Sequence, residues 1–129
     1  MKHSLFYIVF LTIVSCSLSK NIKENALLYY GKTPCLGECP VFDMYIYNDG
    51  KVIYNGFQNV VLKGEHKFSI SKNHINEIKK ELKNIDFKIK TNIVRDLPNI
   101  ILKYNGEKLT VNNKEEIKDL VKLLEKIIN

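Results

Sequence analysis

Apolar and polar positions alternate over several short stretches of the chain, a pattern with the period of β-strands. Two such stretches flank Asp49 and Gly50, and Asp-Gly between strand-like runs is a strong hairpin signal. With these two as the loop residues, we predict that Ile46 faces Ile53. This register predicts a core face with Phe42, Met44, Ile46 and Ile53, and a second face with Tyr45, Tyr47, Val52 and Tyr54.

A second hairpin is predicted around Asn105 and Gly106, another favoured two-residue turn. It pairs Leu102 with Leu109 on one face. The strand pattern predicts strands at residues 26–31, 41–47, 51–57, 59–62, 65–70, 100–104 and 107–111.

Apolar residues three or four positions apart predict two helices. The first follows Ser71, a good N-cap, and the second follows 113–116, which is close to a capping box. Segment 88–99 between them is the least regular, and Pro98 forbids a continuing helix there. The predicted apolar stripes are Ile75, Ile78, Leu82 and Ile85 on the first helix, and Ile117, Leu120, Val121, Leu124 and Ile128 on the second.

The order of these elements is ββββ(β)-α-ββ-α. Tight hairpins imply an antiparallel sheet, and two one-sided helices must cover one of its faces. We therefore predict an α+β fold, a two-layer sandwich in which both helices pack on the same face of the sheet.

The first 15 residues have the features of a secretory signal peptide, with a basic start and an apolar run over 5–14. That run is about half the length of a membrane-spanning helix. Ile13-Val14-Ser15-Cys16 resembles a bacterial lipobox, so we predict that Cys16 becomes an N-terminus carrying acyl chains such as palmitate. The alternative is an ordinary signal peptide beside which Cys16 is incidental.

The remaining chain divides into a short polar segment and one domain. Residues 16–25 lack a hydrophobic period and are predicted to form a tether, while 26–129 have the length of a single domain. We expect a lipid-anchored protein of the bacterial cell envelope that faces the periplasm.

The composition of charged residues limits the classes of partner that we expect. The chain has 20 basic and 14 acidic residues, a net charge of +6, but only Arg95 is arginine and no basic cluster is interleaved with aromatics. Because nucleic-acid surfaces favour the arginine fork, we expect no nucleic-acid partner. A weak attraction to anionic lipid headgroups stays open as an alternative.

Two cysteines remain once Cys16 is assigned to lipid. In an oxidising compartment this favours a structural disulfide between Cys35 and Cys39. A redox pair more typically shows C-x-x-C at a helix start, whereas Pro40 leads into a strand here. A metal site would need more ligands, of which His66 is a candidate. We favour the structural disulfide and keep both alternatives.

Several segments together resemble a bacterial family of unknown function whose members carry a T-P-C-x-G-x-C-P motif, commonly on secreted and lipoprotein chains. The similarity covers Leu27 to Ile128 and implies an uncharacterised extracytoplasmic α+β domain with no assigned activity. Asp96 and Pro98 match the family's Asp-x-Pro pattern, while Arg95 replaces a small polar residue. The segments are T-P-C-L-G-E-C-P-V-F, I-Y-N-D-G-K-V-I-Y-N-G, G-E-H-K-F-S-I-S and R-D-L-P.

No recognised catalytic, phosphate-binding or metal-binding motif is present, so we favour a non-enzymatic protein without a cofactor. Our leading hypothesis is an interaction module that binds an envelope protein or ligand through the face bearing Tyr45, Tyr47 and Tyr54. The rival is a thiol-redox or metal-handling protein that uses the cysteine pair. In a further alternative, His66 and Asp96 converge on the cysteine loop; otherwise each has a local structural role.

Overall fold

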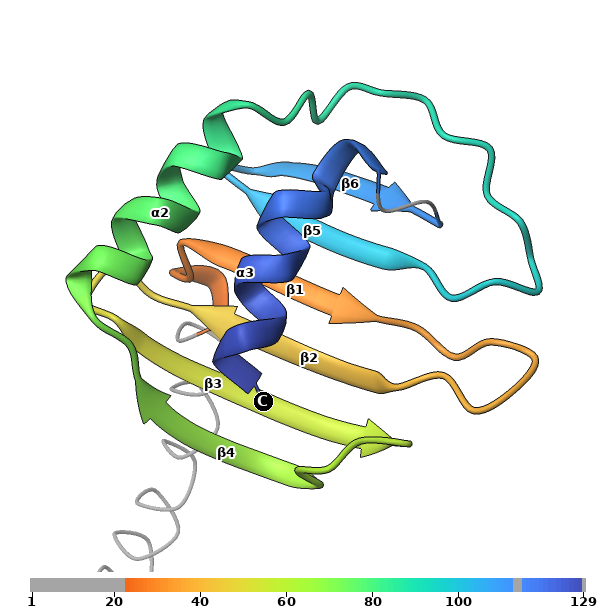
Figure 1. Ribbon diagram of the computed structural model, residues 1–129, viewed down its shortest axis with the longest axis horizontal. Coiled ribbons are helices and arrows are strands. Elements are labelled where there is room, and N and C mark those ends of the chain that lie inside the picture. The colour runs from red at the N-terminus through yellow and green to blue at the C-terminus, as the bar shows by residue number, and fades with distance from the viewer. Residues whose placement is uncertain (1–22, 113–114, 129) are drawn as a thin grey trace, which may run out of the picture.

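The computed structural model describes residues 23–112 and 115–128, which form a six-stranded antiparallel sheet and two α-helices (Figure 1). The α+β prediction is confirmed. The sheet has the order β4-β3-β2-β1-β5-β6. The elements are β1 (Leu28–Lys32), β2 (Val41–Ile46), β3 (Lys51–Gln58), β4 (Gly64–Ser69), α2 (Lys72–Lys83), β5 (Ile100–Tyr104), β6 (Glu107–Val111), the 3-10 helix η2 (Glu115–Ile117) and α3 (Lys118–Ile128).

Both helices lie over the same face of the sheet, which we call the covered face (Figure 1). Side chains that alternate along the strands point into this layer and form one core with the helices. The opposite face, which we call the open face, is covered by neither α2 nor α3 (Figure 1). The strands contribute Leu28, Tyr30, Phe42, Met44, Ile46, Val52, Tyr54, Ile100, Leu102, Leu109 and Val111 to the core.

Each helix buries most of the stripe that its sequence predicts, and Ile128 at the end of α3 is only partly buried. Ser71 caps α2 by accepting a hydrogen bond from the His74 backbone N–H at 3.3 Å. The helix ends at Lys83 and Asn84 caps it, so Ile85 lies beyond the helix and is only partly buried. The buried helical residues are Ile75, Ile78 and Leu82 on α2, Ile117 on η2, and Leu120, Val121 and Leu124 on α3.

The hairpin between β5 and β6 has the predicted register. Asn105 and Gly106 both adopt positive φ, of 50° and 78°, as a two-residue primed turn requires. Leu102 therefore lies opposite Leu109, as predicted.

The predicted register of the first hairpin is wrong by one residue. Tyr47 donates its backbone N–H to the Lys51 carbonyl, which leaves the three-residue loop 48–50, and only Gly50 in it has positive φ. Ile46 consequently faces Val52, and Tyr45 faces Ile53. A slip of one residue exchanges the two faces of a strand, so Val52 and Tyr54 are buried in the core while Ile53 lies on the open face.

A strand predicted at 59–62 is also absent, because this stretch connects β3 to β4. It folds against the covered side of β3: a Cβ added to Gly56 would lie only 1.9 Å from the Leu62 carbonyl oxygen. Packing over a glycine therefore holds this segment beside the strand instead of in the sheet.

Segment 88–99 runs outside β6 before it turns into β5 (Figure 1). The Thr91 hydroxyl donates to the Thr110 carbonyl at 2.6 Å, which fastens the segment to the outer edge of β6. At its end, Asn99 receives the backbone N–H of Thr33 and donates its own N–H to the Thr33 hydroxyl, at 3.0 and 2.9 Å. The segment thus joins the edge of the sheet to the loop after β1.

The predicted signal peptide, Cys16 and the tether up to residue 22 lie outside the described residues, as do 113 and 114 of the predicted capping box. Within 23–112 and 115–128, no helix is both long and apolar enough to cross a membrane.

Candidate interaction surfaces

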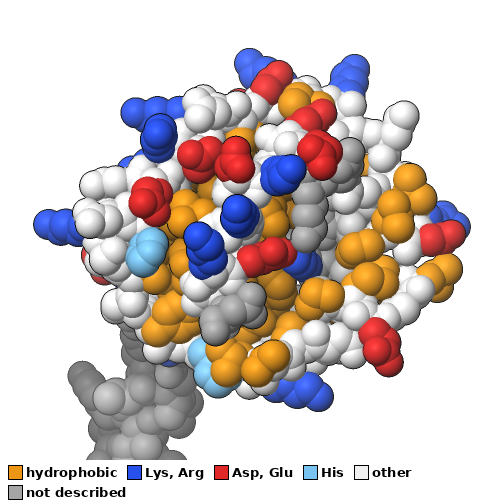
Figure 2. All heavy atoms as spheres, in the orientation of Figure 1, with side chains coloured by type: hydrophobic (Ala, Val, Ile, Leu, Met, Phe, Trp, Pro, Cys, Tyr) orange, Lys and Arg blue, Asp and Glu red, His pale blue; other side chains and the backbone are white. Residues whose placement is uncertain are grey.

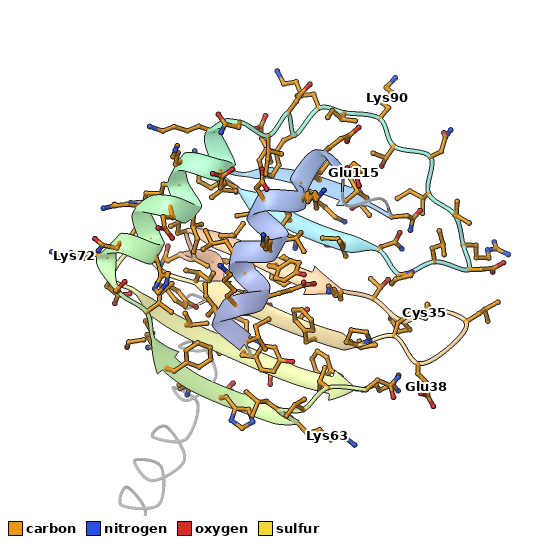
Figure 3. All side chains as sticks on the ribbon, viewed as in Figure 1. Cys35, Glu38, Lys63, Lys72, Lys90 and Glu115 are labelled. Carbon is orange, nitrogen blue, oxygen red and sulfur yellow. A yellow bond between two sulfur atoms is a disulfide. The ribbon has the colours of Figure 1, made fainter. Side chains whose placement is uncertain are left out.

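The cysteine loop is a corner between β1 and β2. Cys35 and Cys39 form the predicted disulfide, with their Cα atoms 5.8 Å apart. Neighbouring loops are tied to it, because Asn59 donates its side-chain amide to the Cys39 carbonyl at 3.2 Å and Leu36 donates its N–H to the Asp96 carbonyl at 3.4 Å. Figure 3 places Cys35 and Glu38 beyond the strand ends.

Large hydrophobic side chains are exposed at this same end of the molecule. They lie on three loops, 33–40, 59–63 and 88–99, which follow β1, follow β3 and precede β5. Figure 2 shows hydrophobic atoms gathered along this side of the surface. We call these loop residues the apolar end; with their exposed fractions they are Leu36 (81%), Val61 (96%), Ile93 (50%), Val94 (50%) and Leu97 (49%).

Hydrogen bonds fix the shape of the apolar end. The Asn112 side chain, just after β6, donates to the Pro98 carbonyl at 3.2 Å and to the Asn99 side-chain oxygen at 2.7 Å. Its own oxygen accepts the backbone N–H of Val94. These bonds and the disulfide hold exposed apolar side chains on a backbone that is attached at several points.

The open face carries an aromatic pair. The rings of Tyr29 and Tyr45 lie 5.1 Å apart, and the Tyr29 hydroxyl donates to Asp43 at 2.6 Å. Two ammonium groups lie over the rings: Lys103 is 5.0 Å from the Tyr29 centroid and Lys23 is 5.3 Å from that of Tyr45. A shallow cavity of about 340 Å³ beside them is lined by all of these residues except Asp43.

Burial raises the pKa of each tyrosine in this region. For Tyr29 the largest cause is burial, followed by the hydrogen bond to Asp43, which favours the neutral phenol. For Tyr45 burial comes first and the charge of Asp43 second. For Tyr47, near the hairpin loop, burial is followed by the charge of Asp49. All three hydroxyls therefore stay protonated at neutral pH and can donate hydrogen bonds.

A polar cluster also lies within the covered layer. The Lys32 ammonium, whose side chain is only 10% exposed, bonds to Glu125 of α3 at 2.7 Å and lies within 6 Å of the Tyr30 and Phe42 ring centroids. The Tyr30 hydroxyl is buried without a hydrogen-bond partner among the described residues. Burial, and then the charge of Glu125, raises its pKa. A cleft of about 210 Å³ adjoins the ion pair and Tyr54.

The remaining candidate residues, His66 and Asp96, lie on different elements of the fold. His66, on β4, donates from its Nε2 to the Lys63 carbonyl at 2.9 Å, on the loop that leads into the same strand. Asp96 reaches that loop through its backbone carbonyl alone. No group of three or more histidine, cysteine or carboxylate side chains is arranged for a metal in the parts of the chain that the structure describes. These contacts therefore lend no support to the alternative in which His66 and Asp96 converge on the cysteine loop.

The tyrosine face differs in composition from the sequence prediction. Tyr45 lies on the open face, but Tyr54 is 1% exposed in the core, where burial raises its pKa. Sequence reasoning missed Tyr29 and Lys103, whose places depend on β1 lying between β2 and β5. The alternation within β1 and β5 was visible, but not which strands were neighbours.

Comparison with known proteins assigns a family but no activity. The chain belongs to the domain-of-unknown-function family DUF6438, whose model matches residues 26–129. No curated protein matches it.

Proposed function

We propose that the protein is a membrane-anchored lipoprotein of the bacterial cell envelope and a non-enzymatic interaction module, which binds another envelope protein through its apolar end. The observation that carries this proposal is the grouping of exposed apolar side chains on three adjoining loops. Contiguous exposed apolar surface on a folded domain usually marks an interaction site.

The direction of the chain supports a protein partner over the anchoring membrane. Tether and anchor precede β1, whose first residue, Leu28, lies at the opposite end of that strand from the loop 33–40. An anchor at Cys16 would therefore hold the molecule by one end and direct the apolar end away from the bilayer. The T-P-C-x-G-x-C-P motif, commonly found on secreted and lipoprotein chains, supports this placement.

The anchor is tested by fatty-acid labelling in cells. Wild-type protein should incorporate radiolabelled palmitate and sediment with membranes, whereas Cys16→Ser should lose the label. A Cys35→Ser/Cys39→Ser variant is the matched control, because it removes cysteines that the proposal assigns to a disulfide, and it should keep the label. Labelling that persists in Cys16→Ser contradicts the lipoprotein assignment.

Binding is tested by placing a photoreactive amino acid at single positions in cells. Leu36 and Val61 should give the same crosslinked product of one discrete mass, and the exposed control position Lys108, on β6, should not. A Leu97→Asp substitution should reduce the product about tenfold, because it places a charge in an apolar contact. Equal products from all three positions would contradict a partner at the apolar end.

The rival thiol-redox function predicts different behaviour of the disulfide. Under our proposal the bond between Cys35 and Cys39 is structural, so thiol labelling of the native protein should be absent without reductant. Intact mass should change only after reduction under denaturing conditions. Rapid cycling of the pair in the native protein, or bound metal in stoichiometric amount, would favour the rival.

A further inference from the structure

The two edge strands of the sheet, β6 and β4, differ in whether another segment of the chain lies along them. Along β6, segment 88–99 lies outside the strand, and the Thr91 hydroxyl bonds to the Thr110 carbonyl. At the other edge, β4 is the last strand, and no element in the described part of the chain lies along its outer side (Figure 1). Unpaired backbone groups on an edge strand are a template for pairing with another strand.

The hydrogen-bond pattern identifies which backbone groups of β4 point outward. The Ile70 N–H donates inward to the Gly50 carbonyl at 2.8 Å, beside the β3–β4 pairing. Since backbone groups alternate in direction along an antiparallel strand, His66 and Phe68 also point inward. The N–H and C=O groups of Glu65 and Lys67 therefore point outward, toward the open edge.

The charges on these outward positions are opposite and self-complementary. Glu65 and Lys67 already form an ion pair at 2.9 Å within one strand, with side chains 47% and 60% exposed. In an antiparallel pair of two β4 strands centred on His66, Glu65 lies directly opposite Lys67 of the second copy, twice by symmetry. Registers centred on Glu65 or on Lys67 would instead oppose like charges, which is unfavourable.

We propose that β4 pairs with β4 of a second copy of this chain, in the antiparallel register centred on His66, to form a continuous twelve-stranded sheet about a twofold axis. Such an interface is isologous and closes at two copies. Further growth is blocked because segment 88–99 occupies the outer edge of β6 in each copy. The charges on β4 thus favour this register over those centred on Glu65 or Lys67.

A strand of six residues buries little surface, so the dimer is weak and forms where copies are concentrated. The test is therefore a crosslink made in the full-length chain in its native membrane. At the centre of the register, His66 faces its own symmetry mate in a pair without backbone hydrogen bonds, with Cα atoms about 4.5 Å apart. That separation permits a disulfide, so His66→Cys should give a covalent dimer under mild oxidation.

Ser69→Cys is the matched control, since Ser69 is exposed on the same strand but lies opposite Lys63 of the second copy. Its dimer yield should be at least fivefold lower than that of His66→Cys. Equal yields from the two positions would indicate random collision and overturn the proposal.

Charge exchange tests the register independently. In the His66→Cys background, Glu65→Lys or Lys67→Glu alone should lower the dimer yield about tenfold, because each places like charges opposite one another. The double variant Glu65→Lys/Lys67→Glu restores opposite pairing and should recover the yield. Failure of the double variant to recover, with circular dichroism showing each variant folded, would overturn the pairing.

Discussion

The two faces of the sheet contain the same three kinds of side chain in different surroundings. On the covered face, Lys32 bonds to Glu125 and lies near Tyr30, whose hydroxyl has no partner among the described residues. On the open face, Lys103 lies over the ring of Tyr29, which donates its hydroxyl to Asp43.

Burial makes the difference between these two clusters. On the covered face, a charge that loses its partner stays in an environment of low dielectric, so the pairing is required for stability. On the open face, water can replace a lost partner, and each contact contributes little. The same residue types therefore stabilise the fold on one side and leave an adaptable polar and aromatic surface on the other.

The largest effect is expected from Glu125→Ala. It leaves the nearly buried Lys32 ammonium without its carboxylate, so we expect the free energy of unfolding to fall by about 2–3 kcal/mol. Urea denaturation of the domain 26–129 measures this change. The control Lys32→Met/Glu125→Leu removes both charges and should recover most of the loss. A change below about 0.5 kcal/mol in Glu125→Ala would mean that the covered pair behaves like a surface pair.

A smaller effect is expected from Gly31→Ala on the open face. The new Cβ would lie 2.3 Å from the Tyr29 hydroxyl oxygen, so the ring must move away from Asp43. We expect a loss of about 1–2 kcal/mol in the free energy of unfolding, measured by urea denaturation.

A double variant separates this clash from a backbone effect of the same substitution. If the clash is the cause, Gly31→Ala should cost nothing further in a Tyr29→Ala background. Additive losses would show that the strand itself, rather than the ring above it, requires glycine.

The two tyrosine hydroxyls should give changes of opposite sign. Tyr30→Phe removes a buried hydroxyl without a described partner, and we expect a gain of about 1 kcal/mol in stability. Tyr29→Phe removes the hydrogen bond to Asp43 and should lose about 1 kcal/mol. Thermal unfolding of both variants under one buffer measures the difference, and changes of the same sign would contradict the contrast between the faces.

Alkaline pH extends this test. The pKa values of both tyrosines are raised in the folded protein by burial, so their contribution to stability is fully present below the ordinary tyrosine value of about 10. It is lost as pH rises toward the folded-state pKa. Both phenylalanine variants should therefore lose less stability than the wild type between neutral and strongly alkaline pH.

The two hairpins show how far sequence could predict the fold. Asn105-Gly106 specifies a two-residue turn through local geometry, and its register followed from the sequence. In the first hairpin a contact distant in sequence matters: Gly50 is buried, its carbonyl accepts the Ile70 N–H, and an added Cβ would lie 2.4 Å from the Ile70 oxygen. That contact occurs beside the longer loop, and it could not be inferred from the loop residues.

The candidate surfaces were less predictable than the fold. The helical stripes follow from residue spacing, and the disulfide from spacing together with a predicted oxidising compartment. The apolar end, in contrast, requires three loops from separate parts of the chain to meet. The polar role of Lys32 was hidden because it alternates with apolar residues on a strand, and its partner Glu125 is 93 positions away. Pairing of β1 with β5 brings the loop 33–40 beside the end of segment 88–99, and single-sequence patterns carry no information about that pairing.

The smallest effect is expected from Lys103→Gln. This exposed ammonium lies over the Tyr29 ring, 5.0 Å from its centroid, and such a cation–π contact contributes about 0.5 kcal/mol, so the free energy of unfolding should change by no more than that. Lys32→Gln is the matched substitution on the covered face, and it should cost several times more because it leaves Glu125 without the ammonium. Urea denaturation of the two variants side by side measures the ratio. Equal losses would mean that burial does not separate the two faces, whereas a large ratio leaves Lys103 free to change without loss of the fold.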